Sequence, residues 1–181
     1  MLTLKRIIAL TFIFTSGYAM TNNQELDGQI SEAAEYFSGA ISGDIDILLP
    51  TKLDRKRLDY SLESLDAVSA WLSELRATNI NSQTEDVADS IIWSGAYVGE
   101  VIKRCAQEPY SWKRYEDYMA TQNESLRNVI PYTFGTQFIL SSKTGAMTLP
   151  VNKVIRFLEE GPENDLRFYA SAECKPVREG V

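Results

Sequence analysis

One carboxylate in the most apolar helical part of the sequence could carry out proton transfer. Glu100 follows Gly99 in the run Gly-Ala-Tyr-Val-Gly-Glu-Val that begins at residue 95. A carboxyl group in an apolar setting can act as a general acid or base, because burial favours its protonated form. Helical spacing places Glu100 about one residue from the buried face, where an ion pair with Arg104 at i+4 also explains it. We favour the ion pair and keep catalysis as the alternative.

The sequence contains no histidine, and this absence removes several kinds of catalytic site. Ser-His-Asp and Cys-His arrangements and histidine-ligated zinc are excluded. Two cysteines cannot form a four-cysteine metal site, and no Walker loop or dinucleotide fingerprint is present. The tripeptide at residues 143–145, Lys-Thr-Gly, also occurs in penicillin-binding proteins and serine β-lactamases, but no Ser-x-x-Lys motif accompanies it. We interpret it as a hairpin turn and expect no metal or other cofactor.

An aromatic stretch with two cations offers candidates for a binding surface. Exposed aromatic residues and arginine are typical of interface hot spots. The alternative is a half-buried strand that packs its aromatic rings on the preceding helix, which is the more frequent arrangement. The candidate binding residues are Trp112, Arg114, Tyr115, Tyr118 and Glu100.

The first nineteen residues have the pattern of a secretory signal. Lys5 and Arg6 precede an apolar run over residues 7–14, and small residues stand at Gly17 and Ala19. We expect cleavage after Ala19 and a secreted or periplasmic mature protein, with residues 20–181 forming a single α+β domain. A membrane anchor is the alternative, but the run is much shorter than the ~20 residues that span a bilayer.

The formal charge of the chain is −7, and loss of Lys5 and Arg6 with the signal changes it to −9. An acidic surface repels nucleic-acid phosphates and anionic lipid headgroups. We therefore expect no nucleic-acid partner and no integral membrane segment after cleavage. A protein partner with a basic surface is compatible with this charge, although acidity also serves solubility.

Two cysteines, Cys105 and Cys174, remain in the mature chain. An even pair in an oxidising compartment predicts a disulfide. Two separate buried thiols are the alternative, because cysteine is often buried.

The periodicity of apolar residues predicts the elements that must position these groups. Helices are expected over residues 27–41, from Ser61 to about residue 78, and from Thr84 to a stop before Pro109. Gly95 and Gly99 each cost the third helix ~1 kcal/mol relative to alanine. This cost predicts a neighbour that approaches closely and makes the third helix central.

The pattern changes after Pro109 to β-prone segments at residues 111–118, 129–134 and 136–141, with a helical turn as the alternative for the first of them. A turn at 143–145 and a return strand at 146–149 follow. Pro150 begins a helix that Gly161 ends, and the last helix covers residues 165–173. This order predicts an α+β fold with N-terminal helices, a small antiparallel sheet and C-terminal helices, in which one layer of helices packs on the sheet.

The run at residues 95–102, followed by Trp112, resembles a pattern in small uncharacterised bacterial proteins. In these proteins a Gly-Ala-Tyr-x-Gly-Glu-Val helix precedes a strand that bears tryptophan. The Ser-x-x-Ser-Leu segment at 61–65 and the Val-x-Lys-Val segment at 151–154 are similar as well. The resemblance covers about residues 58–170. It implies a shared fold, and it assigns no activity and no catalytic residue.

Small size, export, acidity and the lack of catalytic motifs favour a binding protein. We expect a periplasmic inhibitor or immunity-type protein that occludes a secreted enzyme. A carboxylate-dependent hydrolase that uses Glu100 and a structural accessory protein of the envelope are the alternatives.

Overall fold

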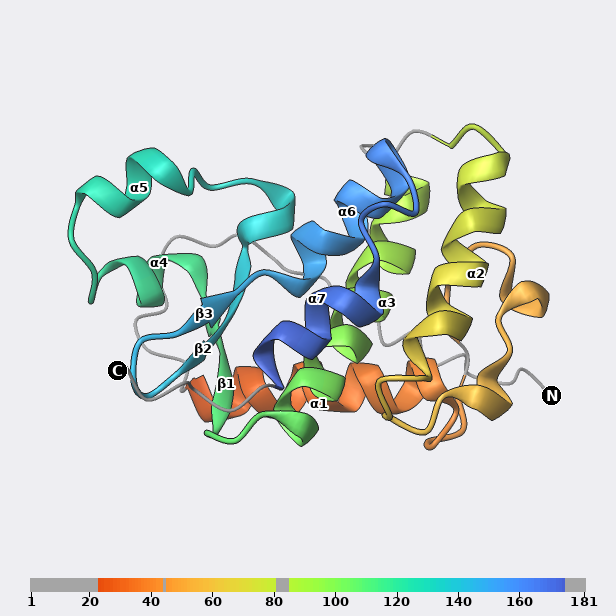
Figure 1. Cartoon of the computed structure of the whole chain (residues 1–181), viewed down its shortest axis with the longest axis horizontal. Coiled ribbons are helices and arrows are strands. Elements are labelled where there is room, and N and C mark those ends of the chain that lie inside the picture. Colours follow the sequence, from red (N-terminus) through yellow and green to blue (C-terminus); the bar gives the residue numbers. More distant parts are fainter. Residues whose placement is uncertain (1–22, 44, 81–84, 175–181) are drawn as a thin grey trace, which may run out of the picture.

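The computed structural model describes residues 23–43, 45–80 and 85–174 (Figure 1). The signal segment and its cleavage site lie outside the described residues, as does Thr84. The elements, in chain order, are α1 (Asn23–Ser38), η1 (Pro50–Lys52), η2 (Arg55–Arg57), α2 (Leu65–Ala77), α3 (Glu85–Cys105), β1 (Tyr110–Arg114), α4 (Tyr115–Met119), α5 (Ser125–Val129), η3 (Phe134–Thr136), β2 (Phe138–Ser142), β3 (Met147–Thr148), α6 (Pro150–Glu160) and α7 (Leu166–Glu173). The predicted α+β class is confirmed, with helices packed against a small antiparallel sheet.

Helix α3 lies at the centre of the fold and contacts α1, α6 and α7. Its two glycines allow neighbouring elements to lie very close to the helix. A β-carbon built on Gly95 would lie 2.8 Å from Cα of Val151 in α6, and one built on Gly99 would lie 2.0 Å from Cζ2 of Trp112 in β1. Real β-carbons do not approach other atoms this closely, so the close neighbours predicted for both glycines are confirmed.

The sheet has the strand order β1-β2-β3, and both pairs of strands are antiparallel. Trp112 pairs with Leu140, and both side chains join the main hydrophobic core. Successive side chains of a strand point to opposite faces. Accordingly, Ile139 joins a smaller cluster with Tyr115 and Tyr118 of α4. Helix α4 therefore adds a cover on the second face of the sheet.

The C-terminal helices begin and end at residues that typically start or stop a helix. Pro150 is the first residue of α6, and Gly161 follows its last turn with a φ of 117°, which favours glycine. The side chain of Asp165 accepts a hydrogen bond from the Phe168 amide at 2.6 Å and caps α7. The turn at residues 143–145 and the return strand β3 confirm the predicted hairpin.

Several predicted boundaries are wrong. Helix α2 begins at Leu65, because Ser61 instead caps a preceding turn, in which its Oγ accepts from the Ser64 amide at 3.2 Å. The predicted strand at 111–118 ends at Arg114 and continues as the helix α4. The segment at 129–134 is not a strand, since Val129 ends α5 and Phe134 begins η3. Within it, Pro131 has no amide hydrogen to donate to a neighbouring strand.

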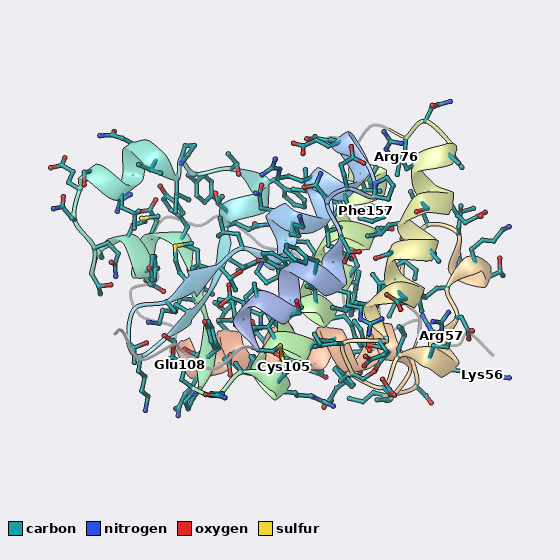
Figure 2. The ribbon with its side chains drawn as sticks, viewed as in Figure 1. Lys56, Arg57, Arg76, Cys105, Glu108 and Phe157 are labelled. Atoms are coloured by element: carbon teal, nitrogen blue, oxygen red, sulfur yellow. A yellow bond between two sulfur atoms is a disulfide. The ribbon has the colours of Figure 1, made fainter. Side chains whose placement is uncertain are left out.

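The predicted disulfide between Cys105 and Cys174 is confirmed. The two Cα atoms are 5.2 Å apart, and the bond joins the end of α3 to the residue that follows α7 (Figure 2). Among the described residues, no helix has the length and apolar character needed to cross a membrane.

Candidate functional site

Glu100 lies in the interior, with 7% of its surface exposed. Its Oε1 atom accepts hydrogen bonds from Ser31 Oγ at 2.9 Å and from Trp112 Nε1 at 3.1 Å, and it lies 2.9 Å from Lys103 Nζ. The predicted ion pair with Arg104 is therefore wrong, because the partner is Lys103 at i+3. The Arg104 guanidinium instead lies over the Tyr60 ring, 3.3 Å from its centroid.

The Lys103 ammonium joins Glu100 to a second carboxylate. Its Nζ lies 3.0 Å from Asp27 Oδ1 and donates to Ser31 Oγ at 3.1 Å. Asp27 Oδ1 also accepts from the Trp112 amide at 2.8 Å. That amide points to the outer edge of β1, where the sheet has no further strand. These five residues form what we call the Glu100 network, which ties α1 and β1 to α3.

The Glu100 network contains a serine and a lysine at the distance of a nucleophile and its base. A base must have a free electron pair, and here two carboxylates stabilise the protonated ammonium of Lys103. The three hydrogens of the ammonium already have acceptors in Glu100, Asp27 and Ser31. Lys103 is thus arranged to hold the carboxylates rather than to activate Ser31. The geometry suits a network that positions three elements.

The predicted aromatic anchors are not on the surface. Trp112, in β1, is completely buried in the main core. Tyr115 and Tyr118 are buried in the smaller cluster. Burial also raises the pKa of the Tyr118 phenol. These three rings were candidates for a partner contact only if exposed; they are buried, as in the more frequent arrangement of aromatic packing in the interior. Arg114 is partly buried at the end of β1. Among the candidates, Trp112 donates to Glu100, and Tyr115 and Tyr118 belong to one cluster.

A different apolar surface lies between α5 and η3. Val129, Tyr132 and Phe134 are large hydrophobic residues that expose 75%, 51% and 40% of their surfaces, and Pro131 between them is exposed as well. We call these four residues the apolar tip. The sequence predicts a β-prone segment at these residues. The signal against a strand was Pro131 inside this apolar run, together with the lack of a turn that would pair the run with a neighbouring strand.

The apolar tip is fixed by hydrogen bonds to the rest of the molecule. The Tyr115 hydroxyl donates to the Ile130 carbonyl at 2.7 Å, and the Tyr115 and Tyr132 rings meet edge to face at 5.3 Å. Thr133 and Thr136 form a capping box, and Thr136 Oγ1 also donates to the Pro131 carbonyl at 2.8 Å. The exposed side chains are therefore presented from an ordered backbone.

The surroundings of the apolar tip are acidic. Glu116, Asp117 and Glu124 are exposed on α4 and beside α5, whereas Arg127 is paired with Glu116 at 3.0 Å.

A basic tract at residues 55–57 lies at the other end of the molecule, beside α2, where Lys56 and Arg57 are labelled in Figure 2.

No group of three or more cysteine or acidic side chains in the described ranges could hold a metal ion. The chain matches no family model, no curated protein and no solved structure in the three comparisons with known proteins. Its function is therefore argued from the geometry above.

Proposed function

We propose that this chain is an exported binding protein that inhibits a secreted enzyme by contacting it through the apolar tip. The observation that carries the proposal is the group of exposed hydrophobic side chains at Val129, Tyr132 and Phe134, held on an ordered backbone. Clustered exposed hydrophobic residues mark protein interaction sites more often than scattered ones. An ordered segment also loses less conformational entropy on binding.

The interior favours binding over catalysis. Glu100 was the best candidate for an enzymatic carboxylate. Its Oε1 atom is already engaged within the fold by hydrogen bonds from Ser31 and Trp112 and by an ion pair with Lys103. A substrate would have to displace these partners and leave a lysine without its counter-ion. The hydrolase alternative therefore has no observation in its favour.

Export is supported by two independent features. The first nineteen residues have the pattern of a secretory signal. The Cys105–Cys174 bond suits an oxidising compartment, because disulfides persist outside the reducing cytosol.

The test is a pull-down with the mature protein, beginning at Met20, as bait. Periplasmic extract and the product of the neighbouring gene are offered at low and high salt. We expect a stoichiometric partner whose recovery falls as salt increases, and a weaker complex with Tyr132→Ala. The proposal fails if no stoichiometric partner is recovered while the protein turns over a small substrate and Glu100→Gln abolishes the turnover. Co-sedimentation with the cell envelope without a stoichiometric partner would favour the structural alternative.

A further inference from the structure

The proposed function leaves open what kind of surface receives the apolar tip. Building on that proposal, we infer that the partner is a protein with an apolar hollow bordered by lysine and arginine residues, and that Tyr132 is the central side chain inserted into it.

The position of the apolar tip favours a hollow on the partner. Helices α4 and α5 and the chain that leads to η3 lie at one end of the molecule, away from α2 (Figure 1). Val129, Tyr132 and Phe134 come from six consecutive residues, so they form a narrow contact rather than a broad flat one. A narrow group of highly exposed side chains buries the most area when the partner surrounds it.

The charges beside the apolar tip decide between possible occupants. Glu116 and Asp117 are exposed on α4, Glu124 is exposed at the N-cap of α5, and with Arg127 these side chains carry a net charge of −2. Arg127 pairs with Glu116 and lies over the Tyr115 ring on which Tyr132 packs, so this charged group, which we call the acidic border, adjoins the apolar tip. A second copy of the chain would bring the same acidic border against itself, and a like-charge contact is unfavourable. A membrane with anionic headgroups would be repelled in the same way. A basic border on a protein partner is the complementary choice.

Tyr132 is the residue best placed to anchor the contact. It lies between Val129 and Phe134 in the chain, and its ring packs edge to face on the buried Tyr115, which limits its freedom before binding. Tyrosine is enriched among hot-spot residues, because its ring buries a large area and its hydroxyl can form a hydrogen bond.

The experiment places the photo-crosslinking residue benzoylphenylalanine at position 132 or at position 168 in the full-length chain, produced in its native host. Phe168 is the matched control, since it is an aromatic residue that is 72% exposed on α7. We expect a single adduct from position 132 and none from position 168. Peptide mapping should place the adduct in an apolar hollow of the partner with lysine or arginine at its border.

The purified partner then allows the two contributions to be separated. Tyr132→Ala should raise the dissociation rate about 30-fold, equivalent to ~2 kcal/mol. The pair Asp117→Asn and Glu124→Gln should lower the association rate at low salt and change the dissociation rate little. Glu32→Gln with Glu163→Gln is the matched control, because it removes the same charge at exposed positions on α1 and after α6. Thermal unfolding of each variant checks that it is folded.

The outcomes separate this inference from the proposed function. Adducts to a second copy of the chain, adducts from position 168 only, no adduct at either position, or an acidic border around the mapped site would each overturn the inference. If the pull-down yields a stoichiometric partner that crosslinks at position 132 but the mapped site has no lysine or arginine at its border, the inference is wrong and the binding function stands. If no bait recovers a partner, the proposed function fails first.

Discussion

The Trp112 ring leaves no room for a side chain at residue 99. A β-carbon there would lie 2.0 Å from Trp112 Cζ2, and the ring itself is completely buried. Gly99→Leu should therefore destabilise the protein by ~1–3 kcal/mol or more, because overpacking forces shifts in a dense core. Urea unfolding of the purified protein measures this loss.

Gly28 provides the matched control for Gly99. It lies on an exposed face within α1, and no heavy atom is within 4 Å of a β-carbon built there. Gly28→Ala should increase stability by ~0.5–1 kcal/mol through helix propensity alone. Equal stability of Gly99→Leu and the wild type would show that α3 is not the central helix.

Lys103 forms ion pairs with two carboxylates in a largely buried place. Lys103→Met should leave Glu100 and Asp27 without their shared cation and cost ~3–5 kcal/mol, the usual penalty for breaking a buried ion pair. The measurement is urea unfolding at neutral pH. The double variant with Glu100→Gln should recover part of the loss, since one uncompensated charge is removed. A loss below ~0.5 kcal/mol for Lys103→Met would contradict the role given to the Glu100 network.

At the scale of elements, a single hydroxyl of α4 holds the backbone that leads into the apolar tip. Tyr115→Phe removes its bond to the Ile130 carbonyl and should raise amide hydrogen exchange over residues 130–134. Global stability should fall by only ~1 kcal/mol, the net value of one hydrogen bond. Tyr118→Phe is the control, because it removes a hydroxyl from the same helix and keeps the Tyr115 bond. Unchanged exchange at residues 130–134 in Tyr115→Phe would refute this role of Tyr115.

Elements with a strong local signal were predictable from the sequence. The apolar stripe and paired glycines of α3, the Pro150 start and Gly161 stop of α6, and the hairpin turn at residue 145 each follow from local chain physics. A helical turn at α4 was only the alternative to a strand, because aromatic residues favour strands, whereas Tyr115, Tyr118 and Met119 bury one helical face at i, i+3 and i+4.

The candidate site was predictable only in part. Glu100 was identified from the sequence, but Ser31, which donates to it, and Asp27, which shares its lysine partner, come from α1, roughly seventy residues earlier. No spacing rule connects positions so far apart, and the tertiary contact decided the pairing. The exposure of Tyr132 and Phe134 likewise depends on the absence of a strand beside them, which local pattern cannot show.

At the scale of the whole molecule, two tyrosines make the stability of the fold depend on pH in the alkaline range. Burial raises the pKa of both Tyr110 and Tyr169, and the Tyr110 hydroxyl donates to Glu173 Oε2 at 2.8 Å. Tyr169 is hydrogen-bonded to Thr148 and accepts from the Leu149 amide. The unfolded chain releases these protons near pH 10, while the folded protein retains them.

The sign of the pH effect follows from these raised pKa values. The stability that the two phenols contribute is present below about pH 10 and is lost as the pH rises further. Urea midpoints measured from pH 8 to pH 11 should be constant at first and then fall, and tyrosinate absorbance should appear with unfolding. Tyr110→Phe should reduce the fall, because one of the phenols with a raised pKa is removed. A midpoint that stays constant above pH 10 would contradict the burial of these phenols.

The disulfide connects the state of the whole chain to its compartment. It joins residues separated by 69 positions and holds the end of α7 to the end of α3. Closing so long a loop in the unfolded chain is worth ~4 kcal/mol on the chain-entropy model. Reduction, or the pair Cys105→Ser and Cys174→Ser, should therefore lower the free energy of unfolding by about this amount.

Protein recovered from the periplasm should carry this bond and begin at Met20 or within a few residues of it, because cleavage after Ala19 and oxidation both follow export. Intact mass and non-reducing peptide mapping measure the two features on one sample. The same chain beginning at Met20, produced in a reducing cytosol, is the control and should contain free thiols and unfold at a lower urea concentration. It should regain the periplasmic midpoint after oxidation in vitro. Exported material that retains Met1, or in which both cysteines are free thiols, would contradict the proposed secretory route without changing the fold.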